Sequence, residues 1–283
     1  MTVDQQTKAA AFRELHNRDG AFVIPNPWDV GSARILESLG FEALATTSAG
    51  FAFSLGLTDG GVTAQQALDH CTAIVAASGL PVSADLEKGF GDSPDAVAET
   101  IRLAAKTGLV GCSIEDFSGD RAKPIYDFNH AVERIDAAVT ASRTMPYAFM
   151  VTARSENYLH GRPDLDDTIR RLKAFEVAGA DVLYAPGLQN LEDIRTVCSE
   201  IKQPVNVVVG APKAGYGVAA LADAGVTRIS VGATFARIAY GEVIRAAKEI
   251  LGQGTLDFTD RAMGFAELSG YFTKADYTSG HYD

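Results

Sequence analysis

The sequence is poor in cysteine and in positive charge. Its 283 residues include three cysteines, and 25 Lys and Arg face 36 Asp and Glu, which gives a net charge of −11. Negative charge repels phosphate backbones and anionic lipid, so we expect neither a nucleic acid nor a membrane as partner. Cys71, Cys112 and Cys198 are widely spaced inside apolar runs, without a CxxC pair or Cys/His cluster for zinc. This predicts reduced, buried thiols in a cytoplasmic protein.

Long hydrophobic runs and several catalytic signatures are also missing. No apolar run approaches the roughly 18 residues of a membrane-spanning helix, and residues 1–18 are too polar for a signal peptide. No GxSxG sequence or Ser-His-Asp order supports a hydrolase triad. Lys88 and Lys123 are expected in loops, and the exposed loop position of Lys213 disfavours the desolvation that a Schiff-base lysine needs. Among the histidines, only His160 is placed just beyond a strand, and the others are expected at the surface or at helix ends.

Short β-rich runs recur along the chain with helical patterns between them. The eight runs cover residues 22–29, 43–50, 81–87, 111–117, 148–156, 181–187, 204–210 and 228–234. Amphipathic stretches such as 95–107 and 165–178 separate them. Apolar strands that alternate with helices indicate a parallel sheet covered by helices. Eight units in about 230 residues predict a (β/α)8 TIM barrel, in one domain over 1–283, with a doubly wound sheet as the alternative.

Glycines and the C-terminal tail add detail to this prediction. A glycine follows many predicted helices, as at Gly40, Gly79, Gly108, Gly179 and Gly225. Such glycines are typical of a left-handed helix end. The tail after residue 252 breaks the rhythm and carries the apolar residues Phe258, Phe265, Leu268, Tyr271, Phe272 and Tyr277. We predict a C-terminal helical extension over 252–283 that packs on a neighbouring subunit, and a helix that covers its own barrel is the alternative.

Polar side chains gather at the ends of the predicted strands, where the active site of such a barrel lies. They are Thr47, Ser48, Ala49 and Gly50 with Asp59 in the next loop, Asp85, Glu87, Glu115 and Arg154. Crowded carboxylates repel one another unless a cation lies among them, and oxygen ligands without Cys or His favour Mg²⁺ or Mn²⁺. Asp85 is the first candidate metal ligand, Glu87 and Glu115 act directly or through water, and Asp59 lies further out. Ion pairs around the barrel rim are the alternative role of these acids.

Arg154 and the turn at 47–50 are candidates for binding an anionic substrate. A guanidinium offers two parallel donors to a carboxylate or phosphonate. Pairing with Glu115 or Glu156 is the alternative role of Arg154. Hydroxyls and backbone N–H groups of the turn suit a second anionic end of a small ligand.

The strand ends together resemble the isocitrate lyase/phosphoenolpyruvate mutase superfamily, from about residue 22 to residue 247. The resemblance is carried in order by TSAG and LGLTDG, SADLEKGFGD, SIEDFSGD, TARSE and ISVGA. It implies a barrel whose last helix is exchanged between subunits, usually in a tetramer built from two dimers. It also implies bound Mg²⁺ and cleavage or rearrangement of C–C or P–C bonds in small 2-oxo or hydroxy acids. By motif, Thr47, Ser48, Ala49 and Arg154 would hold the substrate, Asp85 the metal, and Asp59 and Glu115 its water shell.

The sequence departs from this superfamily at several places. The lyases carry a Lys-Lys-Cys-Gly-His loop whose Cys is the proposed acid, whereas residues 118–126 read SGDRAKPIY. The Lys and Asn of the mutase loop are missing too, apart from Lys123 further on. The Pro-Glu after the sixth strand becomes Pro186 and Gly187, and Ser83 replaces the first acid of an Asp-x-Asp pattern, with Glu87 as a candidate to compensate.

We therefore predict a Mg²⁺-dependent lyase that cleaves a C–C bond in a small 2-oxo or hydroxy acid through a metal-stabilised enolate. Arg154 and Glu115 are its predicted catalytic residues, and a small anionic carboxylate is its substrate. A P–C bond enzyme, such as phosphonopyruvate mutase or hydrolase, is one alternative. A 2-oxo acid binding protein without turnover is another, because the loop acid is missing. We expect a homo-oligomer, a dimer of dimers.

Overall fold

Each of the eight predicted runs contains one strand of a parallel sheet in the computed structural model, which describes residues 4–210 and 216–273. The strands are β1 Phe22–Ile24, β2 Leu44–Ala45, β3 Val82–Asp85, β4 Gly111–Glu115, β5 Met150–Arg154, β6 Val182–Tyr184, β7 Val205–Val208 and β8 Arg228–Ser230. Their spatial order is β1-β8-β7-β6-β5-β4-β3-β2. A 3.0 Å hydrogen bond from Ala45 N to Pro25 O links β2 to the segment after β1. The sheet is therefore a TIM barrel, and the doubly wound alternative was wrong.

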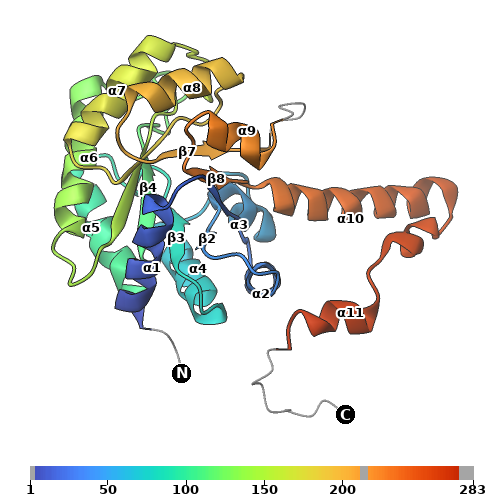
Figure 1. The fold of residues 1–283 in the computed structure, drawn as a ribbon. Helices are drawn as coiled ribbons and strands as arrows, with labels where there is room; N and C mark the ends of the chain where they lie inside the picture. Colours follow the sequence, from blue (N-terminus) through green and yellow to red (C-terminus); the bar gives the residue numbers. More distant parts are fainter. Residues whose placement is uncertain (1–3, 211–215, 274–283) are drawn as a thin grey trace.

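The chain has helices around this barrel and further helices in an arm that projects from it (Figure 1). They are α1 Gln5–Asn17, α2 Val30–Ser38, α3 Ser48–Ser54, α4 Ala64–Ala77, α5 Pro94–Lys106, α6 Phe128–Ser142, α7 Leu165–Val177, α8 Leu191–Glu200, α9 Val218–Asp223, α10 Thr234–Gln253 and α11 Phe265–Gly270, with the 3-10 helix η1 Asp257–Arg261. The predicted stretches 95–107 and 165–178 correspond to α5 and α7. Ser93 caps α5 by accepting a hydrogen bond from Ala96 N, and Pro94 occupies its first turn. In the described part of the chain, no helix has the length and apolar character needed to cross a membrane.

Four of the five predicted helix-ending glycines have left-handed backbones. Gly40, Gly108, Gly179 and Gly225 have φ angles between 90° and 95°. The prediction for Gly79 was wrong, because α4 ends in an extended residue, Ser78, with ψ of 145°. The chain can leave α4 in this extended conformation without a left-handed residue.

The amino end of the barrel is closed and apolar. Phe12 of α1 is fully buried in a cluster with residues at the amino ends of several strands, including Phe22, Val110, Met150 and Val182. Further apolar packing fills the space between the strands and the outer helices. Cys71 and Cys112 are buried and Cys198 is partly exposed, and all three are free thiols. Because α1 plugs one end, a ligand reaches the barrel interior from the carboxyl ends of the strands.

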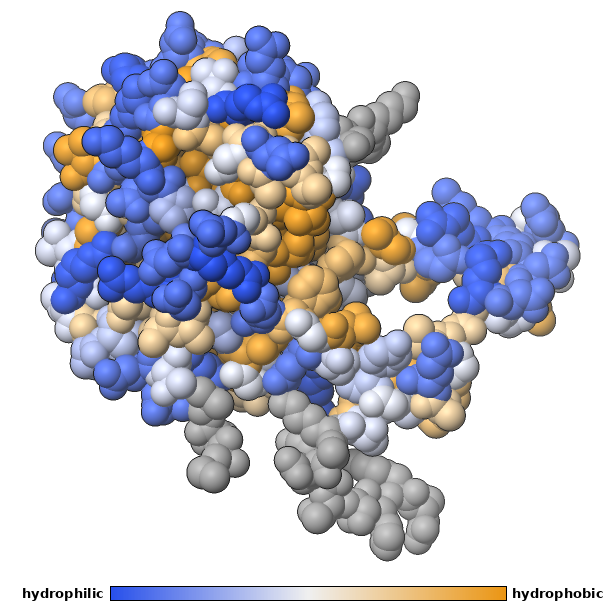
Figure 2. Space-filling view, viewed as in Figure 1, coloured by the Kyte–Doolittle hydropathy of each residue, from blue (hydrophilic) through white to orange (hydrophobic). Residues whose placement is uncertain are grey.

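The helix α10 projects away from the barrel (Figure 1). Ala236 is its one buried residue, and α11 buries none. Large apolar side chains are exposed on this arm, with Leu251 87% and Phe265 90% exposed. Figure 2 shows a further apolar area on the barrel beside the base of α10. The predicted extension thus contains η1 and α11, while Tyr277 lies outside the described residues, and packing on a neighbouring subunit stays a prediction.

Candidate active site

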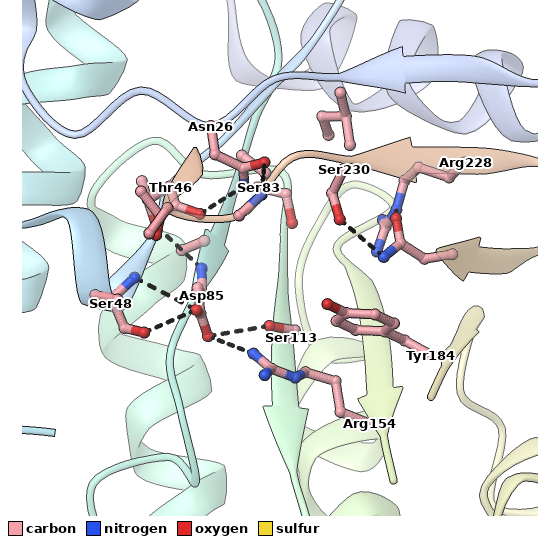
Figure 3. Close-up of a pocket in the computed structure, with 18 of the residues that line it drawn as sticks. Asn26, Thr46, Ser48, Ser83, Asp85, Ser113, Arg154, Tyr184, Arg228 and Ser230 are labelled. Carbon is pink, nitrogen blue, oxygen red and sulfur yellow. Dashed lines mark hydrogen bonds and ion pairs between the residues drawn. The ribbon is translucent and has the colours of Figure 1, made fainter. Parts of the chain in front are cut away.

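A cavity of about 150 Å³ lies inside the carboxyl end of the barrel (Figure 3). Its wall includes six of the residues predicted for the site: Thr47, Ser48, Ala49, Asp59, Asp85 and Arg154. Three predicted residues lie elsewhere. Gly50 is buried in α3, Glu87 lines a smaller adjoining recess, and Glu115 is buried beside Arg154. The strand ends therefore converge as predicted, although not every carboxylate reaches the cavity.

Asp85, the last residue of β3, is held by partners from three other elements (Figure 3). One carboxylate oxygen accepts hydrogen bonds from the backbone N–H and the hydroxyl of Ser48, at 3.3 and 3.0 Å. The other accepts from Arg154 at 2.9 Å and from the Ser113 hydroxyl at 3.4 Å. These contacts fix the carboxylate at the cavity wall in one orientation.

Arg154, the last residue of β5, pairs with three acids at once. Its guanidinium lies 2.9 Å from Asp85, 3.2 Å from Glu115 and 2.9 Å from Glu156. Burial alone would lower the pKa of Arg154, but the charges of Glu156, Glu115 and Asp85 raise it well above its ordinary value. The alternative role of Arg154, pairing with Glu115 and Glu156, is therefore present in the structure. Part of its donor capacity is already used by the protein.

The acids around Asp85 have raised pKa values. Burial, and after it the charge of Asp85, raises the pKa of Asp59. The same two causes, in the same order, raise the pKa of Glu87 to about 7. Burial also raises the pKa of Glu115, against the opposing charge of Arg154. Carboxylates this crowded are stabilised as anions when a cation is bound among them.

This donor set fits a hard divalent cation. Among residues 4–210 and 216–273, no three His, Cys, Asp or Glu side chains lie together as a complete metal-binding group. Mg²⁺ does not need one, because it keeps several waters and takes one or two carboxylates. Asp85 faces the cavity, and Asp59 shares its wall. These oxygens match Mg²⁺ or Mn²⁺ in chemistry and in number.

The segment at 47–50 is the start of α3 rather than a free turn. Thr47 caps this helix, and its hydroxyl accepts a 3.2 Å hydrogen bond from Gly50 N. The hydroxyl of Ser48 is bound to Asp85. Two of the hydroxyls predicted to hold the substrate therefore already have protein partners.

The shortened loop after β4 folds back on itself. Phe117 pairs with Ile125 in an antiparallel bridge, and the Ser118 hydroxyl donates to Lys123 O at 2.7 Å. Lys123 pairs with Asp127 on the surface. His160 stacks on Phe117 with ring centroids 3.8 Å apart, outside the cavity wall. No residue of the loop at 118–126 lines the cavity.

The base of the cavity contains polar residues that sequence reasoning missed. They are Asn26, Ser113, Tyr184, Asn206, Arg228 and Ser230. Ser113 and Asn206 come from within strands and Arg228 is the first residue of β8, whereas sequence reasoning considered the carboxyl ends of strands. Tyr184 and Ser230 are the last residues of β6 and β8, which that reasoning did not single out. Asn206 interrupts the otherwise apolar strand β7, and a polar residue inside such a run was the signal that could have found it.

A closed barrel with an acid- and arginine-lined cavity at its carboxyl end defines the class of protein, and comparison with known proteins gives the family. The chain belongs to the phosphoenolpyruvate phosphomutase family, which it matches over residues 12–251. It is similar to the crystal structure of a provisionally named lyase/mutase from Burkholderia cenocepacia J2315, with 54% identity and a TM-score of 0.93, over 96% of this chain and 98% of that chain.

Two further relatives carry names that state an activity. A crystal structure of 2,3-dimethylmalate lyase, a member of the PEP mutase/isocitrate lyase superfamily, is 28% identical with a TM-score of 0.83, over 96% of this chain and 95% of that chain. The oxaloacetate decarboxylase of Paraburkholderia xenovorans is 29% identical over 265 residues, which cover 88% of this chain and 84% of that protein. The superfamily resemblance is confirmed, and its members include lyases and mutases.

Proposed function

We propose that this protein is a metal-dependent lyase that breaks a C–C bond in a small 2-oxo or hydroxy acid. The observation that carries the proposal is the carboxylate of Asp85, which Ser48 and Arg154 fix at the wall of the cavity. An oriented carboxylate at such a position suits a hard cation and a chelating acid. The names of two relatives, 2,3-dimethylmalate lyase and oxaloacetate decarboxylase, support this class of reaction for the family.

In this proposal Asp85 holds Mg²⁺ or Mn²⁺, and Asp59 and Glu87 contact its waters. When bound, the cation would stabilise negative charge on the substrate oxygen next to the breaking bond. Arg154 orients Asp85 through their 2.9 Å contact, and it directs its remaining N–H capacity toward the substrate. Glu115 acts through Arg154, to which it is paired at 3.2 Å. It is therefore a positioning residue rather than a group that touches the substrate.

The size of the cavity limits the substrate. A cavity of about 150 Å³ holds a benzene-sized ligand of about six non-hydrogen atoms. A three- or four-carbon acid is of this size when part of it extends into the mouth of the barrel. Larger tricarboxylic acids exceed the space unless the mouth residues move.

The experiment is a turnover assay on the full chain. A panel of short 2-oxo and hydroxy acids is incubated with the protein and Mg²⁺ or Mn²⁺, and the release of a 2-oxo acid product is measured. D85N is expected to lose at least about 100-fold in kcat/KM, since removal of one preorganised electrostatic group costs this much in other enzymes. D136N, which changes an exposed acid on α6, is the matched control. Full activity of D85N, or activity that survives EDTA, would contradict the proposal.

A P–C bond enzyme is the second candidate, because the family that the chain matches is described by phosphoenolpyruvate phosphomutase. Against it stands the folded-back loop at 118–126, which lacks the Lys and Asn of the mutases. Phosphorus NMR with phosphonopyruvate separates the two reactions, since only P–C chemistry moves the phosphorus signal. Tight binding of oxalate without turnover of any acid in the panel would instead support a binding protein.

A further inference from the structure

Arg228, the first residue of β8, is a buried cation whose hydrogen-bond partners among the described residues are all uncharged. Its Nε donates to Asn206 Oδ1 at 2.8 Å, and one terminal nitrogen donates to the Thr152 hydroxyl at 3.0 Å. The other terminal nitrogen lies 3.4 Å from His16 Nε2. His16 is neutral, because burial lowers its pKa to about 3. In the described residues no acid forms an ion pair with Arg228, whereas Arg154 has three.

The charge of Arg228 nevertheless persists at neutral pH. Burial lowers its pKa to about 10, and no carboxylate opposes this shift. A guanidinium that is removed from water without a counter-charge is strongly destabilised. It also carries five N–H donors, which the three neutral partners do not exhaust. An anion at this position would supply both the missing charge and the missing acceptors.

The cavity gives such an anion access to Arg228. Arg228, Tyr184 and Ser230 lie at its base and Asp85 on its wall (Figure 3). Asn206 and Asp59 also line the cavity. The Tyr184 hydroxyl points into the cavity (Figure 3). Ser230 Oγ accepts a 3.1 Å hydrogen bond from Asn206 Nδ2, which leaves its own proton to donate. The cavity therefore has carboxylates near its mouth and cationic or neutral hydrogen-bond donors at its base.

We propose that Arg228, with the hydroxyls of Tyr184 and Ser230, forms an anion-binding subsite at the base of the barrel that takes a small oxyanion. The oxyanion is either a second carboxylate of the ligand or a free inorganic anion. The first source rests on the proposed function, because it makes the substrate a dicarboxylate whose far end reaches the base while the near end faces Asp85. The subsite itself does not depend on turnover.

The test measures binding by the full chain in EDTA, so that neither metal nor catalysis is needed. Calorimetry and thermal unfolding are followed with malonate, pyruvate and inorganic phosphate, for the wild type, R228Q, R228K and Y184F. Charge-assisted hydrogen bonds to Arg228 predict a tenfold to hundredfold loss of malonate affinity in R228Q, by the usual strength of such bonds. R228K keeps the charge without the planar donor pair, so its malonate affinity is expected to lie between those of the wild type and R228Q. Y184F is expected to lose severalfold in malonate affinity.

The ligands distinguish the two sources of the anion. If the affinity for malonate depends on Arg228 while phosphate does not bind, the subsite takes a carboxylate of the ligand. If phosphate binds, competes with malonate and is lost in R228Q, the subsite also takes free anions. Unchanged malonate and phosphate affinities in R228Q would overturn the inference. Should R228Q fail to fold, unchanged affinities in both R228K and Y184F would overturn it.

A matched variant separates this inference from the proposed lyase activity. D85N removes the proposed metal ligand and leaves the base of the cavity intact, so it is expected to retain phosphate or malonate binding. A protein without turnover on any acid, in which Arg228 still governs anion binding, would refute the proposed function and leave the subsite standing. Lyase activity in the wild type, together with unchanged malonate affinity in R228Q, would refute the subsite and leave the proposed function standing.

Discussion

Asp85 and Arg154 form a 2.9 Å ion pair that joins the carboxyl ends of β3 and β5. The strand between them, β4, ends in Glu115, which pairs with the same guanidinium at 3.2 Å. The side chains of Asp85 and Arg154 are 19% and 12% exposed, so solvent screens this pair little. Three adjacent strands thus end in charges that compensate one another, and loss of the one cation affects all three acids.

The first prediction follows from this arrangement. R154Q leaves Asp85, Glu115 and Glu156 buried without their common cation, which is expected to cost about 3 kcal/mol of unfolding free energy at pH 7. The loss should shrink toward pH 5, because burial raises the pKa values of Glu115 and Glu156 and their protonation removes uncompensated charge. Urea unfolding at both pH values measures it. R102Q, which breaks an exposed ion pair with Glu99, is the control and should cost under about 1 kcal/mol. Equal losses in the two variants would contradict the prediction.

The second prediction concerns the buried His70. Burial lowers its pKa to about 4, its ring nitrogen bonds Trp28 O at 3.1 Å, and its ring stacks on Phe51 at 3.9 Å. Below pH 6.5 the unfolded chain binds a proton at this residue that the folded chain does not, so stability falls as the pH is lowered. The expected loss from His70 is about 1.4 kcal/mol per pH unit between 6.5 and 4.

Chemical unfolding from pH 7 to pH 4.5 measures this loss. H70Q should show a shallower decline in unfolding free energy than the wild type, because the titrating ring is gone. H130Q, at a more exposed site on α6, provides the comparison. A decline in H70Q as steep as in the wild type would show that His70 is not responsible.

The third prediction is that Mg²⁺ or Mn²⁺ stabilises the protein through Asp85. A ligand that binds only the folded state raises its stability by about 2.7 kcal/mol at 100 times its dissociation constant. Thermal unfolding with and without the metal should therefore show a shift in the wild type and in D136N, and none in D85N. An equal shift in D85N would place the metal elsewhere.

The fourth prediction concerns the projecting arm. Leu251 and Phe265 are nearly fully exposed, and so large an apolar surface is typical of a protein–protein interface. The full chain should form a homo-oligomer in solution, and the double variant L251E/F265E should weaken it. Light scattering across a concentration series gives the mass of each. K248E, a charge change on the same helix, should leave the mass unchanged, and a monomeric wild type would contradict the prediction.

Much of the fold was predictable because its rules are local and repetitive. Alternating β-rich and amphipathic runs predicted eight strands, and all eight lie within the predicted segments. The prediction that glycines end helices in a left-handed conformation was confirmed at Gly40, Gly108, Gly179 and Gly225, since a left-handed backbone excludes most side chains. It failed at Gly79, where an extended Ser78 ends the helix. His16 lies in the last turn of α1, as expected of a helix end, but it is buried. His70, expected at the surface or at a helix end, is buried inside α4, because the packing of α4 against the segment near Trp28 and Phe51 is not encoded locally.

By itself, the sequence determined the barrel and the meeting of Asp85 with Arg154, because parallel strands that end together must bring their last residues to one rim. Only the tertiary structure decided how those charges are divided. It showed that Arg154 is shared among three acids, that Glu87 and Glu115 lie off the cavity wall, and that Arg228 lies at its base. Charge pairing and burial depend on distances between strands far apart in the chain, and periodicity within one strand does not contain that information.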